Sequence, residues 1–129
     1  MKNFIFLFWF SAISIVANCQ EIAPVKATIS GYKSRDTIRI DDFMKFSEIS
    51  LNNKNYSILN FTLLYSDSGF DHEIDSYSNK ITDEMKNAIS ALKNNEEKIR
   101  YIVFRNITVQ MPPNNKLKIE DLILGLKMK

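Results

Sequence analysis

The sequence predicts a mainly β protein, a β-sandwich that carries one amphipathic helix. β-prone segments outnumber helical ones by about six to one. Turn-forming residues separate these segments at the spacing typical of a sandwich. Only the stretch that follows Thr82 has the period of a helix. We find no internal repeat in the 129 residues, and the length suits a single domain.

The N-terminal residues predict a cleaved export signal. Lys2 and Asn3 precede an apolar run from Phe4 to Ala17. This run is shorter than the roughly 20 residues that a membrane-spanning helix needs. We therefore interpret residues 1–19 as a signal peptide and expect a periplasmic or secreted protein with no membrane span after processing.

Two processing routes are open at the only cysteine, Cys19. Ala17 and Cys19 are small residues at the positions that signal peptidase prefers, which favours cleavage before Gln20 and a soluble product. Alternatively, the segment from Val16 to Cys19 resembles a bacterial lipoprotein box, and lipid on Cys19 would tether the protein to a membrane. No disulfide can form within the chain on either route, because one thiol has no intramolecular partner.

The charge balance bears on the class of partner. The chain has 17 lysines and arginines against 15 acidic residues, and Lys2 would leave with the signal peptide. A mature net charge so close to zero gives no electrostatic footprint for nucleic acid or an anionic membrane. We therefore expect no nucleic-acid partner.

The first third of the chain predicts a leader and short β segments. Residues 20–34 carry few large apolar side chains, so we expect a poorly ordered leader with at most a short strand at 26–30, and a folded domain over 35–129. Thr37 to Ile40 is β-prone, and Asp41 with Asp42 predicts the cap of a single helical turn over 43–46.

A hairpin follows. Residues 56–65 predict a central strand, residues 67–69 a tight turn, and residues 70–77 the returning strand. Side chains alternate along a strand, so Phe70, His72 and Ile74 share one face, and the acidic residues between them share the other.

The second half predicts a helix and three more strands. Thr82 caps a helix whose apolar stripe recurs at the helical spacing, at Met85, Ala88, Ile89 and Leu92. Residues 98–111 predict a long strand, and 112–115 a turn, since proline cannot donate to a ladder. Residues 116–119 and 122–126 predict a last pair of extended pieces.

Candidate chemistry is sparse. The densest group of carboxylates comprises Asp67, Asp71, Glu73 and Asp75. These side chains could hold Ca²⁺, or they could form a solvated strand face. His72 is the only histidine, which excludes a zinc site of several imidazoles. No serine lies in the G-x-S-x-G pattern, and the glycines are too far apart for a phosphate loop. We therefore expect neither catalysis nor a cofactor.

One resemblance to a known family is carried by an ordered string of short motifs. The string begins with Asn60-Phe61-Thr62 and Gly69-Phe70 and continues through residues 78–83 before the helix to Phe104-x-x-Ile107 and a proline-bearing turn. The segment from Tyr56 to Leu126 resembles the C-terminal domain of GldM, a gliding-motility and type IX secretion protein of Bacteroidota. The resemblance implies an immunoglobulin-like β-sandwich that binds other proteins of the cell envelope.

The sequence therefore predicts an exported, non-catalytic interaction module whose partner is an envelope protein. The alternative is a secreted ligand or Ca²⁺ binder that uses the acidic hairpin over residues 67–75. Sheet edges matter for the first hypothesis, because an edge can recruit a partner strand through main-chain hydrogen bonds.

Overall fold

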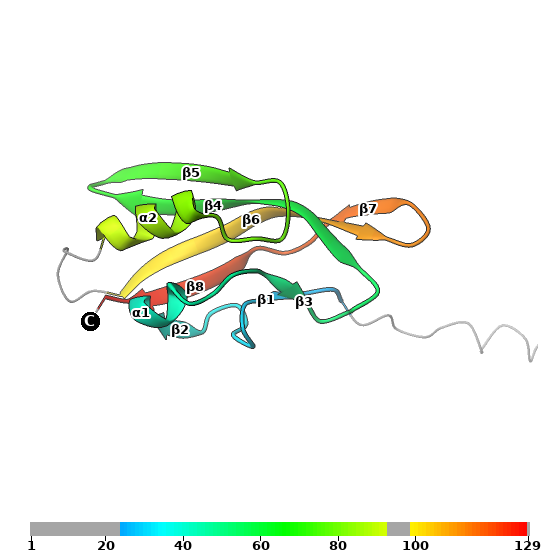
Figure 1. Ribbon diagram of the computed structural model, residues 1–129, viewed down its shortest axis with the longest axis horizontal. Coiled ribbons are helices and arrows are strands. Elements are labelled where there is room, and N and C mark those ends of the chain that lie inside the picture. Colours follow the sequence, from blue (N-terminus) through cyan, green and yellow to red (C-terminus); the bar gives the residue numbers. More distant parts are fainter. Residues whose placement is uncertain (1–23, 93–98, 129) are drawn as a thin grey trace, which may run out of the picture.

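The computed structural model describes residues 24–92 and 99–128, and these residues form eight strands and two short helices (Figure 1). The prediction of a mainly β protein is confirmed. One large sheet has the order β2-β8-β6-β4-β5, with β7 added on β6. A separate small sheet pairs β1 with β3, so the strands lie in two unequal sheets, as in a β-sandwich.

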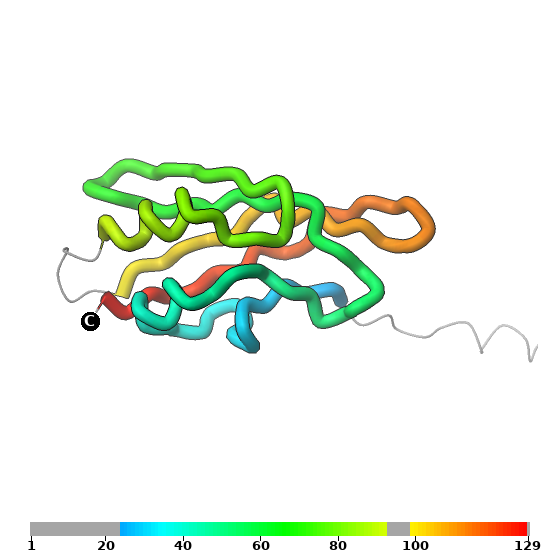
Figure 2. The backbone as a smooth tube through the Cα atoms, in the orientation of Figure 1, coloured from blue at the N-terminus to red at the C-terminus, as the bar shows by residue number. Residues whose placement is uncertain are grey.

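The large sheet is antiparallel except at one border. Its long strands are β4 (Ser57–Asp67), β5 (Phe70–Ser76) and β6 (Ile99–Met111), and β8 (Leu122–Lys127) continues it on the other side of β6. The border strand β2 (Thr37–Arg39) runs parallel to β8. β7 (Asn115–Lys118) forms a hairpin with the end of β6 and extends away from the body (Figures 1 and 2).

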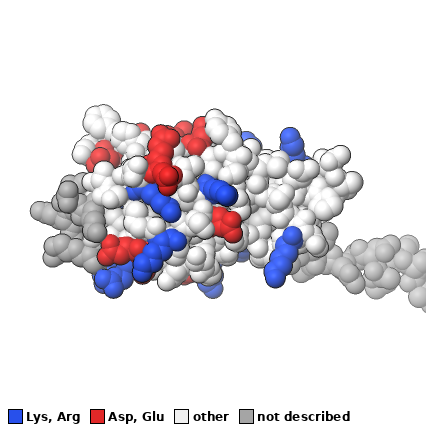
Figure 3. All heavy atoms as spheres, in the orientation of Figure 1, with Lys and Arg blue, Asp and Glu red and all other residues white. Residues whose placement is uncertain are grey.

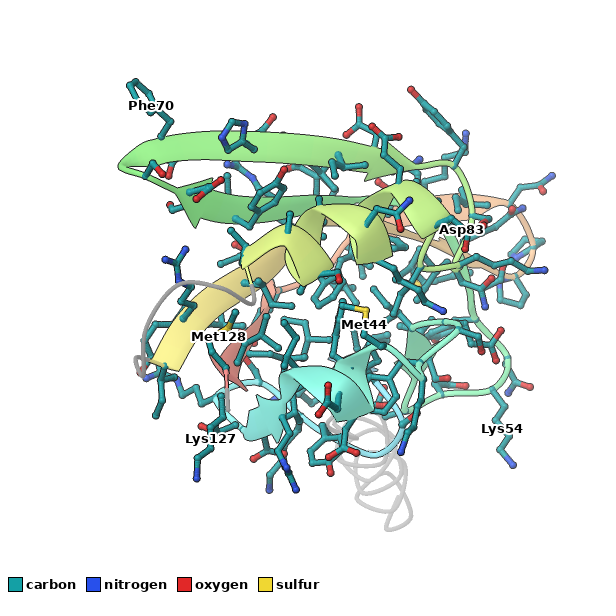
Figure 4. The ribbon with its side chains drawn as sticks, turned by 60° about the vertical axis from the view of Figure 1, so that its left-hand side comes forward. Met44, Lys54, Phe70, Asp83, Lys127 and Met128 are labelled. Carbon is teal, nitrogen blue, oxygen red and sulfur yellow. The ribbon has the colours of Figure 1, made fainter. Side chains whose placement is uncertain are left out.

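One face of the large sheet is covered by the remaining elements. These are α1 (Ile40–Phe43), α2 (Asp83–Ala91), and the small sheet of β1 (Ala27–Thr28) and β3 (Ser50–Leu51). Figure 4 shows both helices on the same side of the strands. The side chains between the two layers are almost completely buried and include Phe43, Ile49, Phe61, Leu63, Met85, Ile89, Ile102, Phe104 and Leu124.

The helix α2 begins and packs as predicted. The backbone N–H of Met85 donates to the Thr82 hydroxyl over 3.2 Å, which satisfies one of the amides that a helix start leaves without a partner. Met85, Ile89 and Leu92 are buried, so the stripe read from the sequence is the face that covers the sheet.

A single irregularity decides which side of β6 is buried. Asn106 has a positive φ of 52° and interrupts the regular pairing of β6 with β4. Ile102 and Phe104 are buried before it, and Ile107 and Val109 are buried after it. The bulge shifts the alternation by one residue, so both halves of the strand direct apolar side chains into the same core.

The start of the described chain is more ordered than predicted. The short strand predicted at 26–30 is present as β1, but Ala27 and Ile29 belong to the core and β1 pairs with β3, so residues 24–34 are not a poorly ordered leader and the folded part begins before residue 35. The helical turn predicted at 43–46 lies earlier, in α1, and Asp41 and Asp42 occupy its first turn instead of capping it. Ile40 and Phe43 are both buried, so packing sets the helix start rather than a capping side chain.

Candidate protein-binding edge

The strand β5 forms an exposed border of the large sheet. It pairs with β4 along its whole length, and on its other side no element of residues 24–92 or 99–128 is paired with it (Figure 1). The backbone of such a strand alternates between groups bonded to its neighbour and groups that point outwards. A seven-residue border of this kind is a template for an added strand.

The register of β5 is fixed by the tight turn before it. Ser68 and Gly69 have positive φ angles of 52° and 83°, the combination that a two-residue hairpin turn requires. Asp67 then pairs with Phe70, and pairing continues without a break to Phe61 and Ser76. The turn therefore determines which side chains of β5 share a face.

The face of β5 that points away from the helices carries three acidic residues, each held by a side chain of β4 or β6. Asp75 accepts a hydrogen bond of 2.6 Å from the Thr62 hydroxyl, and Asp71 accepts one from Ser66. Glu73 pairs with Arg105 of β6, with 3.3 Å between the guanidinium and carboxylate. These contacts order the carboxylates while leaving them exposed to solvent.

The other face of β5 is apolar and faces the helix layer. His72 stacks on Tyr65 of β4, with ring centroids 5.2 Å apart and an angle of 23° between the rings. Ile74 packs against the core, whereas Phe70 is 72% exposed at the tip of the hairpin (Figure 4). The predicted sharing of one face by Phe70, His72 and Ile74 agrees with the register.

The other two borders are less suited to strand addition. β2 has three residues and is followed at once by α1, which leaves almost no free edge. β7 has four residues, and two of them are lysines, a residue type that blunts exposed edges. Among the described strands that have one neighbour in the large sheet, β5 is the longest.

The structure does not gather the four predicted Ca²⁺ ligands. Asp67 pairs with Phe70 and so lies on the opposite face from Asp71, Glu73 and Asp75. Within the described ranges, no three carboxylate, histidine or cysteine side chains lie close enough to hold a metal ion. Cys19, the candidate lipidation site, lies outside the described residues.

The surface also carries shallow grooves with mixed linings. One of about 380 Å³ lies between β3 and the start of β4 and is lined by Leu51, Lys54, Tyr56, Ile58 and Asn79 among others. A second of about 270 Å³ is lined by Lys26 and Lys33 together with Glu120 and Asp121. Neither lining contains His72, the one histidine available as a general base.

Acidic and basic side chains are unevenly spread over the molecule. On the face seen in Figure 3, acidic groups gather in the upper part, near β5 and α2, whereas Lys and Arg lie mainly in the middle, in the lower part and around β7. The candidate edge is therefore on the more acidic side of the protein.

No protein-family model matches the chain, and no curated protein is significantly similar to it. Among the described residues, neither helix has the length and apolar character required to cross a membrane.

Sequence reasoning missed the two most prominent apolar side chains of the sheet surface. Phe70 was assigned to a face but not recognised as exposed, and Tyr101 of β6 is 65% exposed on the side away from the helices. The position of Phe70 directly after a glycine turn was an available signal, because a hairpin tip extends beyond the core. No comparable signal in the sequence distinguishes Tyr101.

Proposed function

We propose that the protein is an exported, non-catalytic interaction module that binds another protein of the cell envelope. The observation that carries the proposal is the free border of β5, seven residues long, with an apolar side chain exposed at its end. Strand addition supplies affinity through main-chain hydrogen bonds and specificity through alternate side chains. Export is inferred from the apolar N-terminal segment before Cys19.

The proposed architecture is a variant of the immunoglobulin-like sandwich. In that fold, strands C, F and G form one sheet, and the variable type adds C′ beside C. β4, β6 and β8 would correspond to C, F and G, with β5 in the place of C′. The helix α2 would occupy the segment that holds strands D and E in a complete sandwich. This is the strand order of the immunoglobulin-like sandwich that the resemblance to the C-terminal domain of GldM implies.

The proposal predicts a partner that depends on the β5 border. The exported protein, carrying a C-terminal tag, is purified from crosslinked envelopes of its own cells, and the enriched proteins are quantified by mass spectrometry. We expect Phe70→Ser to lower the enrichment of a specific envelope protein, because it removes the exposed apolar side chain at the end of the border. Leu117→Ser is the matched control, because Leu117 is 43% exposed on β7, far from β5, and its replacement should leave the enrichment unchanged (Figure 1).

Two results would contradict the proposal. One is equal enrichment by the wild-type chain and Phe70→Ser, which would place any binding elsewhere. The other is the recovery of the unprocessed chain in the cytosol, which would remove the envelope as its compartment. Melting curves of both variants establish that the substitutions leave the fold intact.

A further inference from the structure

Residues 24–92 and 99–128 leave the face of the large sheet opposite the helices uncovered, and this face has a patterned surface. Its side chains alternate with the core residues of the same strands, so Tyr101 and Val103 point away from Ile102 and Phe104. No described element packs on this outer face, while the helices and the small sheet lie on the other (Figure 4). We use the name outer face for this surface of β2, β8, β6, β4 and β5.

The centre of the outer face is apolar. Val103 pairs with Ile123 on one side and with Leu64 on the other, and all three are half-buried. Next to this row, Tyr101 pairs with Gly125 and is 65% exposed, and Ile99 is 50% exposed. Two of the large exposed apolar side chains of the described protein therefore lie together on β6.

Gly125 lies buried at this centre, beneath the side chains of its neighbours. A Cβ atom added at this position would lie 3.0 Å from the Thr37 hydroxyl, 3.1 Å from Ile99 and 3.6 Å from Tyr101. The three neighbours already close over the glycine backbone, yet Tyr101 and Ile99 keep half or more of their surface in solvent. Packing over Gly125 therefore buries only part of Ile99 and Tyr101, and the rest of their apolar surface remains exposed to solvent.

The two sides of the outer face carry opposite charges. Arg39 of β2 pairs with Lys127 of β8, and both are exposed at one side of the sheet. Asp71, Glu73 and Asp75 of β5 lie at the opposite side. Arg105 forms an ion pair with Glu73, whereas Asp71 and Asp75 accept hydrogen bonds from hydroxyl groups. The face is thus basic at β2, apolar at β6 and acidic at β5.

We propose that the outer face binds a second copy of this chain, face to face, around a two-fold axis that runs along β6. β6 is the middle strand of the five. A two-fold rotation about an axis parallel to the strands reverses their lateral order, so β5 of one copy faces β2 of the other. The acidic side then meets the basic side twice, and the apolar centres meet at the axis.

The charge pattern selects this arrangement over the other two-fold arrangement. An axis perpendicular to the strands would place β5 against β5 and bring the six acidic residues of two copies together. With the axis along β6, Arg39 lies one row from Asp71 of the second copy, about 7 Å along the strand, a distance that an arginine side chain spans. The two sheets would pack with nearly aligned strands, as in other sandwiches.

The expected dimer is of moderate affinity. Five strands about 4.8 Å apart give a face roughly 20 Å wide, which corresponds to an interface at the small end of specific complexes. Interfaces of this size dissociate in the micromolar range when only a few aromatic side chains anchor them. This inference concerns a surface other than the β5 border, so the partner enrichment and the dimer can fail independently.

The mass of the exported protein in solution tests the proposal. Sedimentation equilibrium is performed on the purified exported chain from about 1 to about 100 μM. We expect a monomer–dimer equilibrium, and Tyr101→Lys should weaken it at least about tenfold, because it places two cations at the axis. Leu117→Lys is the control, as it introduces the same charge at an exposed apolar residue outside the outer face.

A charge exchange distinguishes the proposed axis and does not depend on Tyr101. Arg39→Glu and Asp71→Lys should each weaken the dimer, and the double variant should restore it, since both charges are exchanged across the axis. The proposal is overturned if the protein is monomeric over the whole range, or if the dimer is unaffected by Tyr101→Lys. Failure of the double variant to restore a dimer that both single variants weaken would also overturn it.

Discussion

Successive residues of β6 point to opposite faces of the sheet, and one of these faces is buried whereas the other is exposed to solvent. Phe104 is fully buried and lies 5.7 Å from Phe61, ring centroid to ring centroid, under the helix layer. Tyr101 on the other face is 65% exposed, although both are aromatic residues of the same strand. The difference shows that the position of the helices, and not the residue type, determines which face of this sheet becomes the core.

The largest expected effect tests that difference directly. Phe104→Ala should destabilise the protein by about 3–5 kcal/mol, because it removes a large buried side chain and leaves a cavity. Tyr101→Ala should cost less than about 1 kcal/mol, since the ring makes only surface contacts. Urea unfolding of both variants at submicromolar concentration, where a dimer contributes nothing, measures the two values. Similar losses would mean that the outer face is also covered in solution.

The second test adds a methyl group to the outer face instead of removing an aromatic side chain. Gly125→Ala should destabilise the protein by about 1–2 kcal/mol, because the new Cβ would approach Thr37 and Ile99 more closely than packing normally allows. Both neighbours are β-branched and have little rotamer freedom in a strand. Thr37→Ala in the same chain should recover part of the loss. Unchanged stability of Gly125→Ala would show that this face is looser than the core.

The third test weakens the helix layer that covers one of the two faces. Thr82→Ala removes the hydroxyl that accepts from Met85 and should cost about 1 kcal/mol. Ser90→Ala serves as the control, because Ser90 is exposed on the same helix and is not at its start. Thermal unfolding followed by circular dichroism gives the difference. A loss as large for Ser90→Ala would rule out capping as the cause.

The sequence was most informative where local geometry decides the outcome. The faces of β5 were predicted residue by residue, because the turn at Ser68 and Gly69 fixes the register of the hairpin. The start of α2 and its buried stripe were predicted for the same reason: the cap at Thr82 and the helical period are both local.

Non-local packing limited the remaining predictions. The alternation of β6 was recognised, but a bulge at Asn106 and the placement of α2 decide which residues are buried. Ile29 is fully buried although its neighbours are polar or small, since it is β1 and β3 that close the core around it. The exposed pair Ile99 and Tyr101 could not be predicted either, because in the sequence they belong to the same alternating pattern as the core residues.

The smallest expected effect concerns the ion pair on the outer face. Glu73 and Arg105 lie 3.3 Å apart, and their side chains are 56% and 41% exposed. Solvent screens such a pair, so Glu73→Gln should change the stability of the monomer by less than about 0.5 kcal/mol. Asp75→Asn, which alters the 2.6 Å hydrogen bond with the part-buried Thr62, is the comparison on the same strand and should cost more. A loss in the free energy of unfolding as large as that of Thr82→Ala would mean that the Glu73 carboxylate is less solvated than an exposed sheet face allows. The two faces of the sheet would then differ less in burial than the structure indicates.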